Sequence, residues 1–152
     1  APKYQGITNS QINKYQLEDN KGLIEVIAGN YKNVAGAAST FSPVNMLNAR
    51  IEEGGKAGFS FPAAYNTALL VVAGEINVNG TQTVAENHFV LFENEGEDFN
   101  IEATKKSIVL ILSGEPLNEP IAAQGPFVMN TPEEIAQAIK DYNLGKFGYL
   151  EE

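Results

Sequence analysis

Cysteine is absent from this chain of 152 residues. Its absence excludes disulfides, thiolate metal ligands and cysteine nucleophiles, and it fits a reducing compartment, so we expect a cytoplasmic protein. Long apolar runs are also absent: the longest, residues 68–73 and 108–112, are far shorter than the ~20 residues that cross a bilayer. The composition therefore predicts a soluble domain, with neither a membrane span nor a disulfide framework.

Basic residues are scarce, with 10 lysines and arginines against 19 aspartates and glutamates, which gives a formal net charge of −9. Such a charge repels phosphate backbones and anionic lipid, so neither nucleic acid nor a membrane is an expected partner. Solubility alone explains the acid excess. Attraction of a basic partner protein is the functional alternative.

Short β-rich runs recur along the chain between glycine, asparagine and acidic turns, a pattern typical of an all-β sandwich or barrel. Residues 108–112 do not alternate between apolar and polar, which predicts a central strand covered on both faces. Asn79 and Gly80 predict a tight type I′ turn, because both residues accept positive φ angles. We expect strands at residues 23–28, 44–51, 58–61, 67–72, 75–78, 82–84, 89–93, 99–103 and 107–112.

A helix is expected over residues 132–143, because its ends carry clear signals. Thr131 can cap the first turn, Pro132 suits the first helical position, and Glu134 completes a capping box. Gly145 can adopt the left-handed conformation that ends a helix. An inward stripe with a spacing of three and four residues would then comprise Ile135, Ala138, Ile139 and Tyr142.

The segment before this helix resembles the carboxyl end of pirin-family proteins, in GEPLNEP at residues 114–120 and GPFVMNT at residues 125–131. The likeness continues weakly through PKYQ at 2–5, VIAGNY at 26–31 and FPAAYNTALLVVAGEINVNG at 61–80. Pirin-like proteins are bicupins with two barrels joined by a linker, and they approach twice this length. The resemblance therefore implies the second barrel alone.

The fold implied is an all-β cupin barrel, a double-stranded β-helix or jelly roll, with a C-terminal α-helix. Residues 1–20 would form an N-terminal arm or linker remnant, residues 21–113 the barrel, and residues 114–152 a loop and the helix. The loop and helix would pack on the barrel or on a partner.

Metal-binding cupins carry the pattern G-x5-H-x-H-x3-E-x6-G, with a further histidine from a later hairpin. Alternate residues on a strand place the paired histidines on one inward face, where imidazole and carboxylate suit iron or manganese. This chain keeps the spacing between the turn glycines Gly55 and Gly74. The ligand positions, however, hold Phe61, Ala63, Thr67 and Phe99. The resemblance therefore implies a barrel without a metal or another cofactor.

The only histidine, His88, stands near the opening turn of the second motif and not at a ligand position. A single imidazole is a poor substitute for a converging ligand set. No G-x-S-x-G elbow or phosphate-binding loop is present, so we assign no catalytic residue. The acidic cluster of Glu93, Glu95, Glu97 and Asp98 does not match an EF-hand, and a solvated turn is expected, with adventitious calcium as the alternative.

The aromatic residues at strand spacing leave two interpretations of the barrel interior. They can fill it as core, or they can leave an apolar pocket that accepts a flat small molecule. The residues that would rim this pocket are Phe59, Phe61, Tyr65, Phe89 and Phe99.

The apolar run at residues 125–129 lies in a loop, and it could be a core lid or an interaction surface. Together with the helix it could pack against a partner. The candidate interface residues are Phe127, Val128, Met129, Ile135, Ile139 and Tyr142.

We therefore expect a structural or protein-interaction domain with no chemistry of its own. Its partner would be the N-terminal cupin barrel of the same protein or a homo-oligomer mate. A divergent, quercetinase-like dioxygenase and a cupin that binds a small apolar ligand are the alternatives. In the family, the resemblance implies iron and quercetin 2,3-dioxygenase activity in the first barrel, so a full-length protein could be an enzyme through that barrel.

Overall fold

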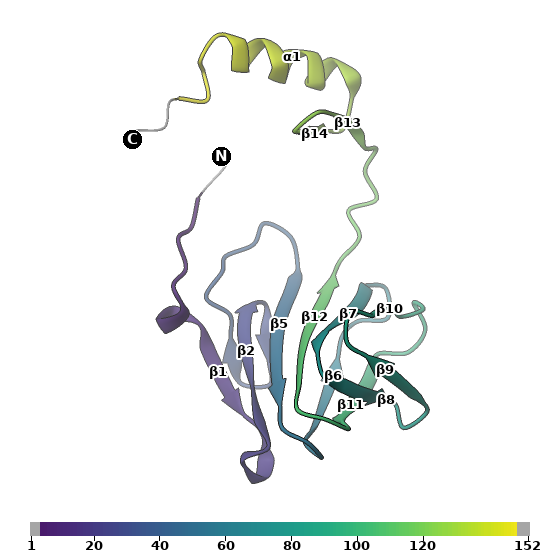
Figure 1. Ribbon diagram of the computed structural model, residues 1–152. Helices are drawn as coiled ribbons and strands as arrows, with labels where there is room; N and C mark the ends of the chain where they lie inside the picture. The colour runs from purple at the N-terminus through teal and green to yellow at the C-terminus, as the bar shows by residue number, and fades with distance from the viewer. Residues whose placement is uncertain (1–3, 149–152) are drawn as a thin grey trace. The chain divides into compact units, whose positions relative to one another are not determined.

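The computed structural model describes residues 4–148. The chain divides into two compact units, Ala1–Pro116 and Leu117–Glu152. The first unit holds the two large antiparallel sheets, and the second holds a small hairpin and one helix (Figure 1). No helix within residues 4–148 is long and apolar enough to span a bilayer.

The larger sheet has 6 strands in the order β1-β2-β5-β12-β7-β10, and every neighbouring pair is antiparallel. Strand β12 pairs with β5 on one side and β7 on the other, so the expected central position of this strand is confirmed. The strands are β1 Asn13–Gln16, β2 Gly22–Ala28, β5 Val44–Ile51, β7 Asn66–Ala73, β10 Phe89–Leu91 and β12 Ser107–Gly114.

The smaller sheet has 4 strands in the order β6-β11-β8-β9. Its strands are β6 Lys56–Ser60, β8 Glu75–Val78, β9 Gln82–Ala85 and β11 Asp98–Ala103. A two-stranded hairpin of β3 Asn30–Tyr31 and β4 Val34–Ala35 follows β2, and short 3-10 turns occupy Asn9–Gln11 and Glu18–Asn20.

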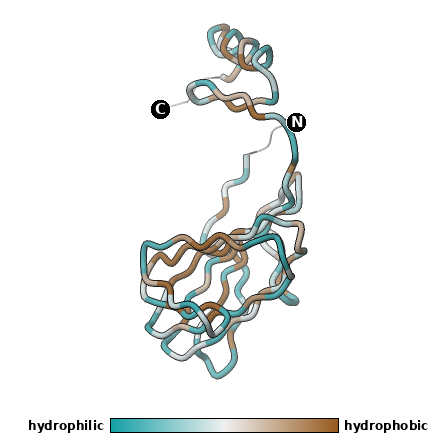
Figure 2. Tube along the Cα trace, turned by 90° about the vertical axis from the view of Figure 1, so that its right-hand side faces the viewer, coloured by the Kyte–Doolittle hydropathy of each residue, from teal (hydrophilic) through white to brown (hydrophobic). Residues whose placement is uncertain are grey.

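One hydrophobic core lies between the two sheets, and both sheets contribute to it. Strand β12 alternates, with Val109 and Ile111 fully buried and Ile108, Leu110 and Leu112 half-buried. The outer face of this strand is therefore only partly covered, and the expectation that both faces are covered is wrong to that extent. Figure 2 shows apolar residues concentrated along the strands, with hydrophilic residues at the turns between them. Each fully buried isoleucine or leucine contributes about 1.5–3 kcal/mol.

The predicted type I′ turn is present between β8 and β9. Asn79 and Gly80 have φ angles of 52° and 69°, and the Thr81 amide donates to the Val78 carbonyl at 3.1 Å. The Asn79 side chain also accepts a hydrogen bond of 2.9 Å from the Asn100 amide on β11. The turn therefore fixes both the hairpin and its position beside β11.

Ser107, which is 1% exposed, ties the start of β12 to the start of β8. Its hydroxyl accepts from the Glu75 amide at 2.9 Å and lies 3.0 and 2.7 Å from the carbonyls of Glu75 and Lys105. Gly74 faces this hydroxyl with a φ of 83°, and a Cβ there would collide with the Ser107 hydroxyl and the Lys106 carbonyl. Both the backbone conformation and this contact therefore require glycine at position 74.

An ion-pair cluster occupies the outer face of β2 and β5. The carboxylate of Glu25, whose side chain is 9% exposed, lies 3.0 Å from Arg50 Nε and 3.5 Å from Lys14 Nζ. The Asn48 amide group donates to the same carboxylate. Burial raises the pKa of Glu25, but the hydrogen bonds from Asn48 and Arg50 and the nearby positive charges together hold it below its ordinary value.

The second unit contains β13 Ala122–Gln124, β14 Phe127–Met129 and α1 Pro132–Asn143. The capping box is confirmed, because Thr131 Oγ1 accepts from the Glu134 amide at 3.2 Å and the Glu134 carboxylate accepts from the Thr131 amide at 3.0 Å. Helix α1 packs on the β13–β14 hairpin. Within the helix, the buried residues are Ile135 and Ala138. Tyr142 is 64% exposed, so its expected place in the inward stripe is wrong.

Several strand regions differ from the sequence prediction, and the β3–β4 hairpin was not expected at all. Strand β1 lies inside the expected arm of residues 1–20 and pairs with β2 at the edge of the large sheet. Strands β13 and β14 form a hairpin where only a loop was expected. The expected strand at 58–61 is shifted to β6 Lys56–Ser60, which pairs with β11 from Glu102 to Asp98 and leaves Phe61 outside the strand.

Candidate functional site

The positions that correspond to cupin metal ligands converge in the first unit. They all line one small cavity of about 90 Å³, which also borders the acidic segment 93–98. The converging residues are Phe61, Ala63, Thr67 and Phe99. These residues come from β7, β11 and the segment after β6.

Two buried hydroxyls lie beside this cavity. Thr67 and Ser113 face each other across β7 and β12, with their hydroxyl oxygens 2.9 Å apart. Thr67 is 9% exposed and Ser113 is 3% exposed. Because each hydroxyl is the other's hydrogen-bond partner, neither needs an ion to satisfy it.

A chain of aromatic rings runs from β1 through the barrel to the segment after β10. Tyr15 and Tyr31 have ring centroids 5.3 Å apart, as do Tyr31 and Phe59. Phe59 then lies 5.1 Å from Phe99, and Phe99 lies 4.4 Å from Phe92. Pairs at such separations add about 0.5–1.5 kcal/mol each beyond their buried area. These rings belong to the hydrophobic core or pack directly against it.

The donor set around the small cavity does not fit a transition metal. Its ligand positions supply one hydroxyl, that of Thr67, and no imidazole or carboxylate. The carboxylates that border the cavity, in segment 93–98, belong to exposed residues. Within residues 4–148, no three histidine, aspartate or glutamate side chains gather closely enough to hold a metal ion. Transition metals bound by cupin-type sites need converging nitrogen and oxygen donors at about 2 Å.

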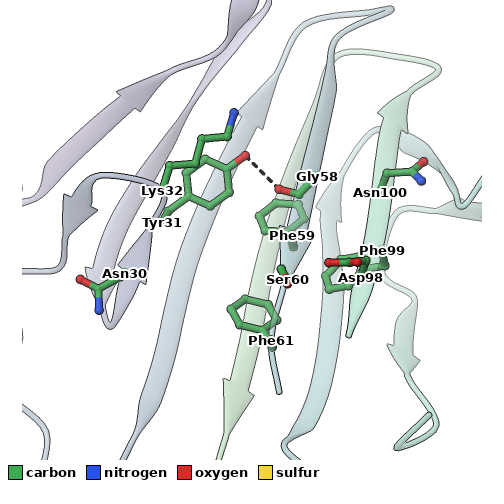
Figure 3. A pocket seen from close by; sticks show the side chains of 10 residues that line it. All are labelled: Asn30, Tyr31, Lys32, Gly58, Phe59, Ser60, Phe61, Asp98, Phe99 and Asn100. Carbon is green, nitrogen blue, oxygen red and sulfur yellow. Dashed lines mark hydrogen bonds between the residues drawn. The ribbon is translucent and has the colours of Figure 1, made fainter. Parts of the chain in front are cut away.

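A larger cavity of about 520 Å³ lies between the β3–β4 hairpin and strands β6 and β11 (Figure 3). Tyr31 reaches across it and donates a hydrogen bond of 3.1 Å to the Gly58 carbonyl. Burial raises the pKa of the Tyr31 hydroxyl. The cavity is lined by Asn30, Tyr31, Lys32, Gly58, Phe59, Ser60, Phe61, Asp98, Phe99 and Asn100.

Lys32 stands at this cavity and contacts two tyrosines. Its ammonium group donates to the Tyr15 hydroxyl at 3.2 Å and lies 4.7 Å from the centroid of the Tyr15 ring. The hydrogen bond to Tyr15 is the main reason that the pKa of Lys32 is raised. The cavity thus has aromatic walls and a cation beside it.

The five residues expected to rim an apolar pocket do not form one group. Phe59, Phe61 and Phe99 line the larger cavity, whereas Tyr65 borders only the smaller one of these two. Phe89 is 59% exposed on β10, opposite Leu70, so its expected place in the pocket is wrong. The reason is strand parity: within β10 it is Val90, and not Phe89, that packs on the core.

His88 lies in the turn between β9 and β10 and is exposed. Its Nδ1 atom is 3.0 Å from the Glu86 carbonyl, and its own backbone carbonyl accepts from the Val71 amide. It lines neither of the two cavities. This is the environment of an ordinary turn histidine.

The candidate interface residues gather in the second unit, around a small aromatic cluster. The ring of Phe127 lies 6.3 Å from that of Tyr142 and 6.2 Å from that of Phe147. Val128, Tyr142 and Phe147 remain more than 60% exposed, at 66%, 64% and 61%. The sequence analysis missed Phe147, which lies five residues after Tyr142 and beyond the end of the helical pattern.

The family model for the pirin C-terminal cupin domain matches residues 46–148. The chain belongs to this family. Its matched segment runs from β5 to the residues after α1, and so includes all the ligand positions discussed above. The cupin fold inferred from the resemblance is confirmed.

Pirin-family relatives extend the match over nearly the whole chain. A Pseudomonas aeruginosa protein that bears the provisional name quercetin 2,3-dioxygenase is 36% identical over 96% of this chain and 51% of its own length. Human pirin is 30% identical over 97% of this chain and 52% of its own length. The crystal structure of a quercetin 2,3-dioxygenase from Acinetobacter baumannii matches with a TM-score of 0.90 and 39% identity, over 98% of this chain and 52% of that one. The chain therefore spans about half the length of these pirin-family relatives.

Proposed function

We propose that this chain is a metal-free structural and protein-interaction domain of a pirin-like protein, with no chemistry of its own. The observation that carries the proposal is the filling of the ligand positions. Phe61, Ala63, Thr67 and Phe99 surround one cavity of about 90 Å³, and their only side-chain polar group is a hydroxyl already bonded to Ser113. A metal placed there would lose water and gain only the Thr67 hydroxyl from these four positions, because the carboxylates that border the cavity belong to exposed residues.

The aromatic chain supports the structural half of this proposal. Rings from the large sheet, the β3–β4 hairpin and the small sheet contact one another in succession, from Tyr15 through Tyr31 and Phe59 to Phe99. In a metal-binding barrel, an ion would join ligands from separate strands. In this barrel, ring packing and area burial hold the same region together.

The second unit supports the interaction half. Its helix buries Ile135 and Ala138, while large apolar side chains stay exposed. An exposed apolar surface on so small a unit is typical of a protein-protein contact. The exposed side chains are Leu117, Ile121, Val128, Tyr142, Leu144 and Phe147. Another cupin barrel, from the remaining half of a longer pirin-like protein or from a second copy, would cover them.

Metal analysis tests the central claim. The purified chain is incubated with Fe²⁺, Mn²⁺, Ni²⁺, Cu²⁺ or Zn²⁺, desalted, and measured by inductively coupled plasma mass spectrometry. We expect no stoichiometric metal, and chelators should leave the unfolding temperature unchanged. One metal ion per chain that survives desalting and raises the unfolding temperature would overturn the proposal.

Binding of a small aromatic ligand is a second candidate function, favoured by the cavity of about 520 Å³ that Phe59, Phe61 and Phe99 line. Ligand pockets of about 300–1,000 Å³ with apolar walls and a few polar groups accept molecules of that kind. The fluorescent probe 8-anilinonaphthalene-1-sulfonate should then bind saturably. Ser60→Trp, which places a large ring at the cavity wall, should abolish the signal, whereas Ser10→Trp at an exposed turn outside the cavity should not.

A divergent dioxygenase is the remaining alternative, favoured only by the names of the relatives. It predicts oxygen consumption with quercetin after metal reconstitution, and loss of that activity in His88→Ala. We expect no oxygen consumption above the metal-only background. Activity that depends on His88 would replace the interaction proposal with an enzymatic one.

A further inference from the structure

The small cavity of about 90 Å³ has aromatic walls. Phe61 and Phe99, which are 8% and 7% exposed, have ring centroids 6.2 Å apart, and the ring of Phe92 lies 4.4 Å from that of Phe99. Tyr65, a half-buried residue, lines the same cavity. The faces of aromatic rings carry negative charge density, so they attract cations as well as apolar groups.

Four acidic residues also border this cavity, and all belong to the exposed segment 93–98. Within residues 4–148, none of their carboxylates forms an ion pair. No lysine, arginine or histidine of the described residues lines the cavity. The negative charge beside the aromatic walls is therefore not balanced by cations of the described chain. The four residues are Glu93, Glu95, Glu97 and Asp98.

The volume of the cavity restricts the group that can enter it. About 90 Å³ corresponds to roughly three water molecules, at about 30 Å³ each in the liquid. This volume excludes a drug-sized molecule, which needs a pocket of about 300 Å³ or more. The end of a lysine side chain, its ammonium group with two methylene groups, is of the right size. A guanidinium group with its first methylene is larger.

Thr67 adds a hydrogen-bond acceptor to the cavity wall. The residue is 9% exposed, and its hydroxyl oxygen lies 2.9 Å from that of Ser113. A hydroxyl has one donor hydrogen and two acceptor lone pairs, so this single contact leaves Thr67 able to accept another hydrogen bond. An ammonium group has three donor hydrogens and no acceptor. The hydroxyl can therefore replace part of the water that such a group loses on entry.

We propose that this cavity accepts the ammonium end of a lysine side chain from a basic partner protein. The inference rests on the proposed interaction role, and it names the chemistry of the partner. The rings would contact the methylene and ammonium groups, and the carboxylates would balance the charge across the interface. A transition metal needs converging donors at about 2 Å, whereas an ammonium group needs only a ring centroid within about 6 Å. The lack of metal ligands therefore does not exclude an organic cation.

The exposure of the carboxylates sets the expected strength. Mobile ions screen exposed charges, so binding should weaken as salt is added. A cation over an aromatic ring contributes only modestly at an exposed site. A single lysine side chain should therefore bind with a dissociation constant in the millimolar range, and a folded partner would add contacts around it.

An NMR titration of the intact, isotope-labelled chain with the peptide acetyl-alanyl-lysyl-alanine amide tests the inference. We expect saturable shifts of the amide signals of residues 61–67 and 92–99, and weaker binding as KCl is added. The same peptide with norleucine in place of lysine has a similar side chain without the charge, and it should bind roughly tenfold more weakly. The arginine peptide should also bind more weakly, because its guanidinium group is too large for the cavity.

Tyr65→Leu tests the aromatic wall. The backbone of Tyr65 bonds to Pro62 and Asn94, and the substitution leaves these bonds in place. We expect roughly threefold weaker binding of the lysine peptide and an unchanged circular dichroism spectrum. Tyr142→Leu is the matched control, because Tyr142 is exposed and does not line this cavity.

The double variant Glu95→Gln with Glu97→Gln tests the charge, and Ala63→Leu tests the volume, since Ala63 lines the cavity and a larger side chain would fill it. Both should weaken binding by roughly fivefold or more. Glu86→Gln is the matched control for charge, because Glu86 is exposed and lies outside the cavity. That substitution should leave the affinity for the lysine peptide unchanged.

Equal binding of the lysine and norleucine peptides would overturn the inference, because the cation would then contribute nothing. Tighter binding of the arginine peptide would overturn the size argument. Shifts spread over the whole acidic surface, or an equal loss in Glu86→Gln, would show only a non-specific attraction to the net charge of −9. Metal analysis stays independent of these results. A metal-free chain that does not bind the lysine peptide would remove this inference alone, whereas stoichiometric metal with intact lysine binding would remove only the metal-free role.

Discussion

Thr67 and Ser113 lie directly opposite each other on β7 and β12, and their hydroxyl oxygens are 2.9 Å apart in the buried interior. By the spacing of the cupin metal-binding pattern, Thr67 stands where a carboxylate ligand is expected. The two hydroxyls thus form a neutral, mutually satisfied pair at a position where the metal-binding pattern requires a charge.

Breaking this pair should destabilise the barrel. Thr67→Val keeps the side-chain shape but leaves the Ser113 hydroxyl buried without a partner, which costs about 1–3 kcal/mol. The double variant Thr67→Val with Ser113→Ala should recover part of that loss, because it leaves no unpaired group. Urea denaturation of both single variants and the double variant checks the non-additivity. Strictly additive losses would show that the two hydroxyls do not interact.

Restoring the ligands should create a metal site. Because the four positions line one cavity, Phe61→His, Ala63→His, Thr67→Glu and Phe99→His together should bring three imidazoles and a carboxylate within reach of one ion. We expect stoichiometric Ni²⁺ or Mn²⁺ by isothermal titration calorimetry and a metal-dependent rise in unfolding temperature. The matched control moves the last histidine to Phe89, on the outer face. Equal metal binding by the control would show that the positions do not converge.

The Asn79-Gly80 turn should need glycine at position 80 because of the backbone conformation there, and not because of a close contact. A Cβ at Gly80 would meet no neighbouring atom, but its φ of 69° is left-handed. Gly80→Ala should therefore lower the free energy of unfolding by about 1–2 kcal/mol. Gly58→Ala is the control, since a Cβ there also meets open space and its φ is not left-handed. That substitution should be neutral or stabilise by up to about 1 kcal/mol, as thermal unfolding would show.

Acid should weaken the ion-pair cluster of β2 and β5 through Glu25. Burial raises the pKa of Glu25, but the hydrogen bonds from Asn48 and Arg50 and the charges of Arg50 and Lys14 together hold it below its ordinary value of 4.5. The folded state therefore favours the charged carboxylate. Its stabilisation is present above about pH 4.5 and is lost as pH falls through the lower folded pKa.

Glu25→Gln should accordingly cost roughly 1.5–3 kcal/mol at pH 7 and much less near pH 3. Urea denaturation at both pH values measures the difference. The control Glu102→Gln removes an exposed ion pair with Lys56, which should cost less than about 1 kcal/mol at either pH. A loss at Glu25→Gln that does not change with pH would contradict the role of its charge.

Local sequence signals predicted the parts of the fold that depend only on residues close together in the chain. The capping box at Thr131 and the turn at Asn79 and Gly80 are defined by side chains and φ preferences within a few residues, and both are present. Strand β1 was missed because its sequence, NKYQ, has no clear apolar-polar periodicity. Its strand conformation is stabilised instead by pairing with β2. The β13–β14 hairpin likewise depends on packing against α1.

The candidate site was predictable in its grouping but not in its extent. The resemblance to the cupin metal-binding pattern grouped Phe61, Ala63 and Thr67, and all three line one cavity, although Phe61 and Ala63 lie between β6 and β7 and not on a strand as expected. The larger cavity was not predictable, since Tyr31 lies in a two-residue strand and Lys32 in the turn after it, and neither segment has a distinct sequence pattern. Phe89 was misplaced because an exposed and a buried aromatic residue look alike in sequence.

The close approach of Gly74 to Ser107 couples two positions that are far apart in the chain. Any larger side chain at residue 74 would displace the hydroxyl that holds the start of β8, and any larger side chain at residue 107 would press on the Gly74 backbone. Evolutionary drift at either position is therefore constrained by the other. Among homologous barrels, glycine at the first position and a small hydroxyl residue at the second should be inherited together, and should be lost together where the hairpin that follows has been rebuilt.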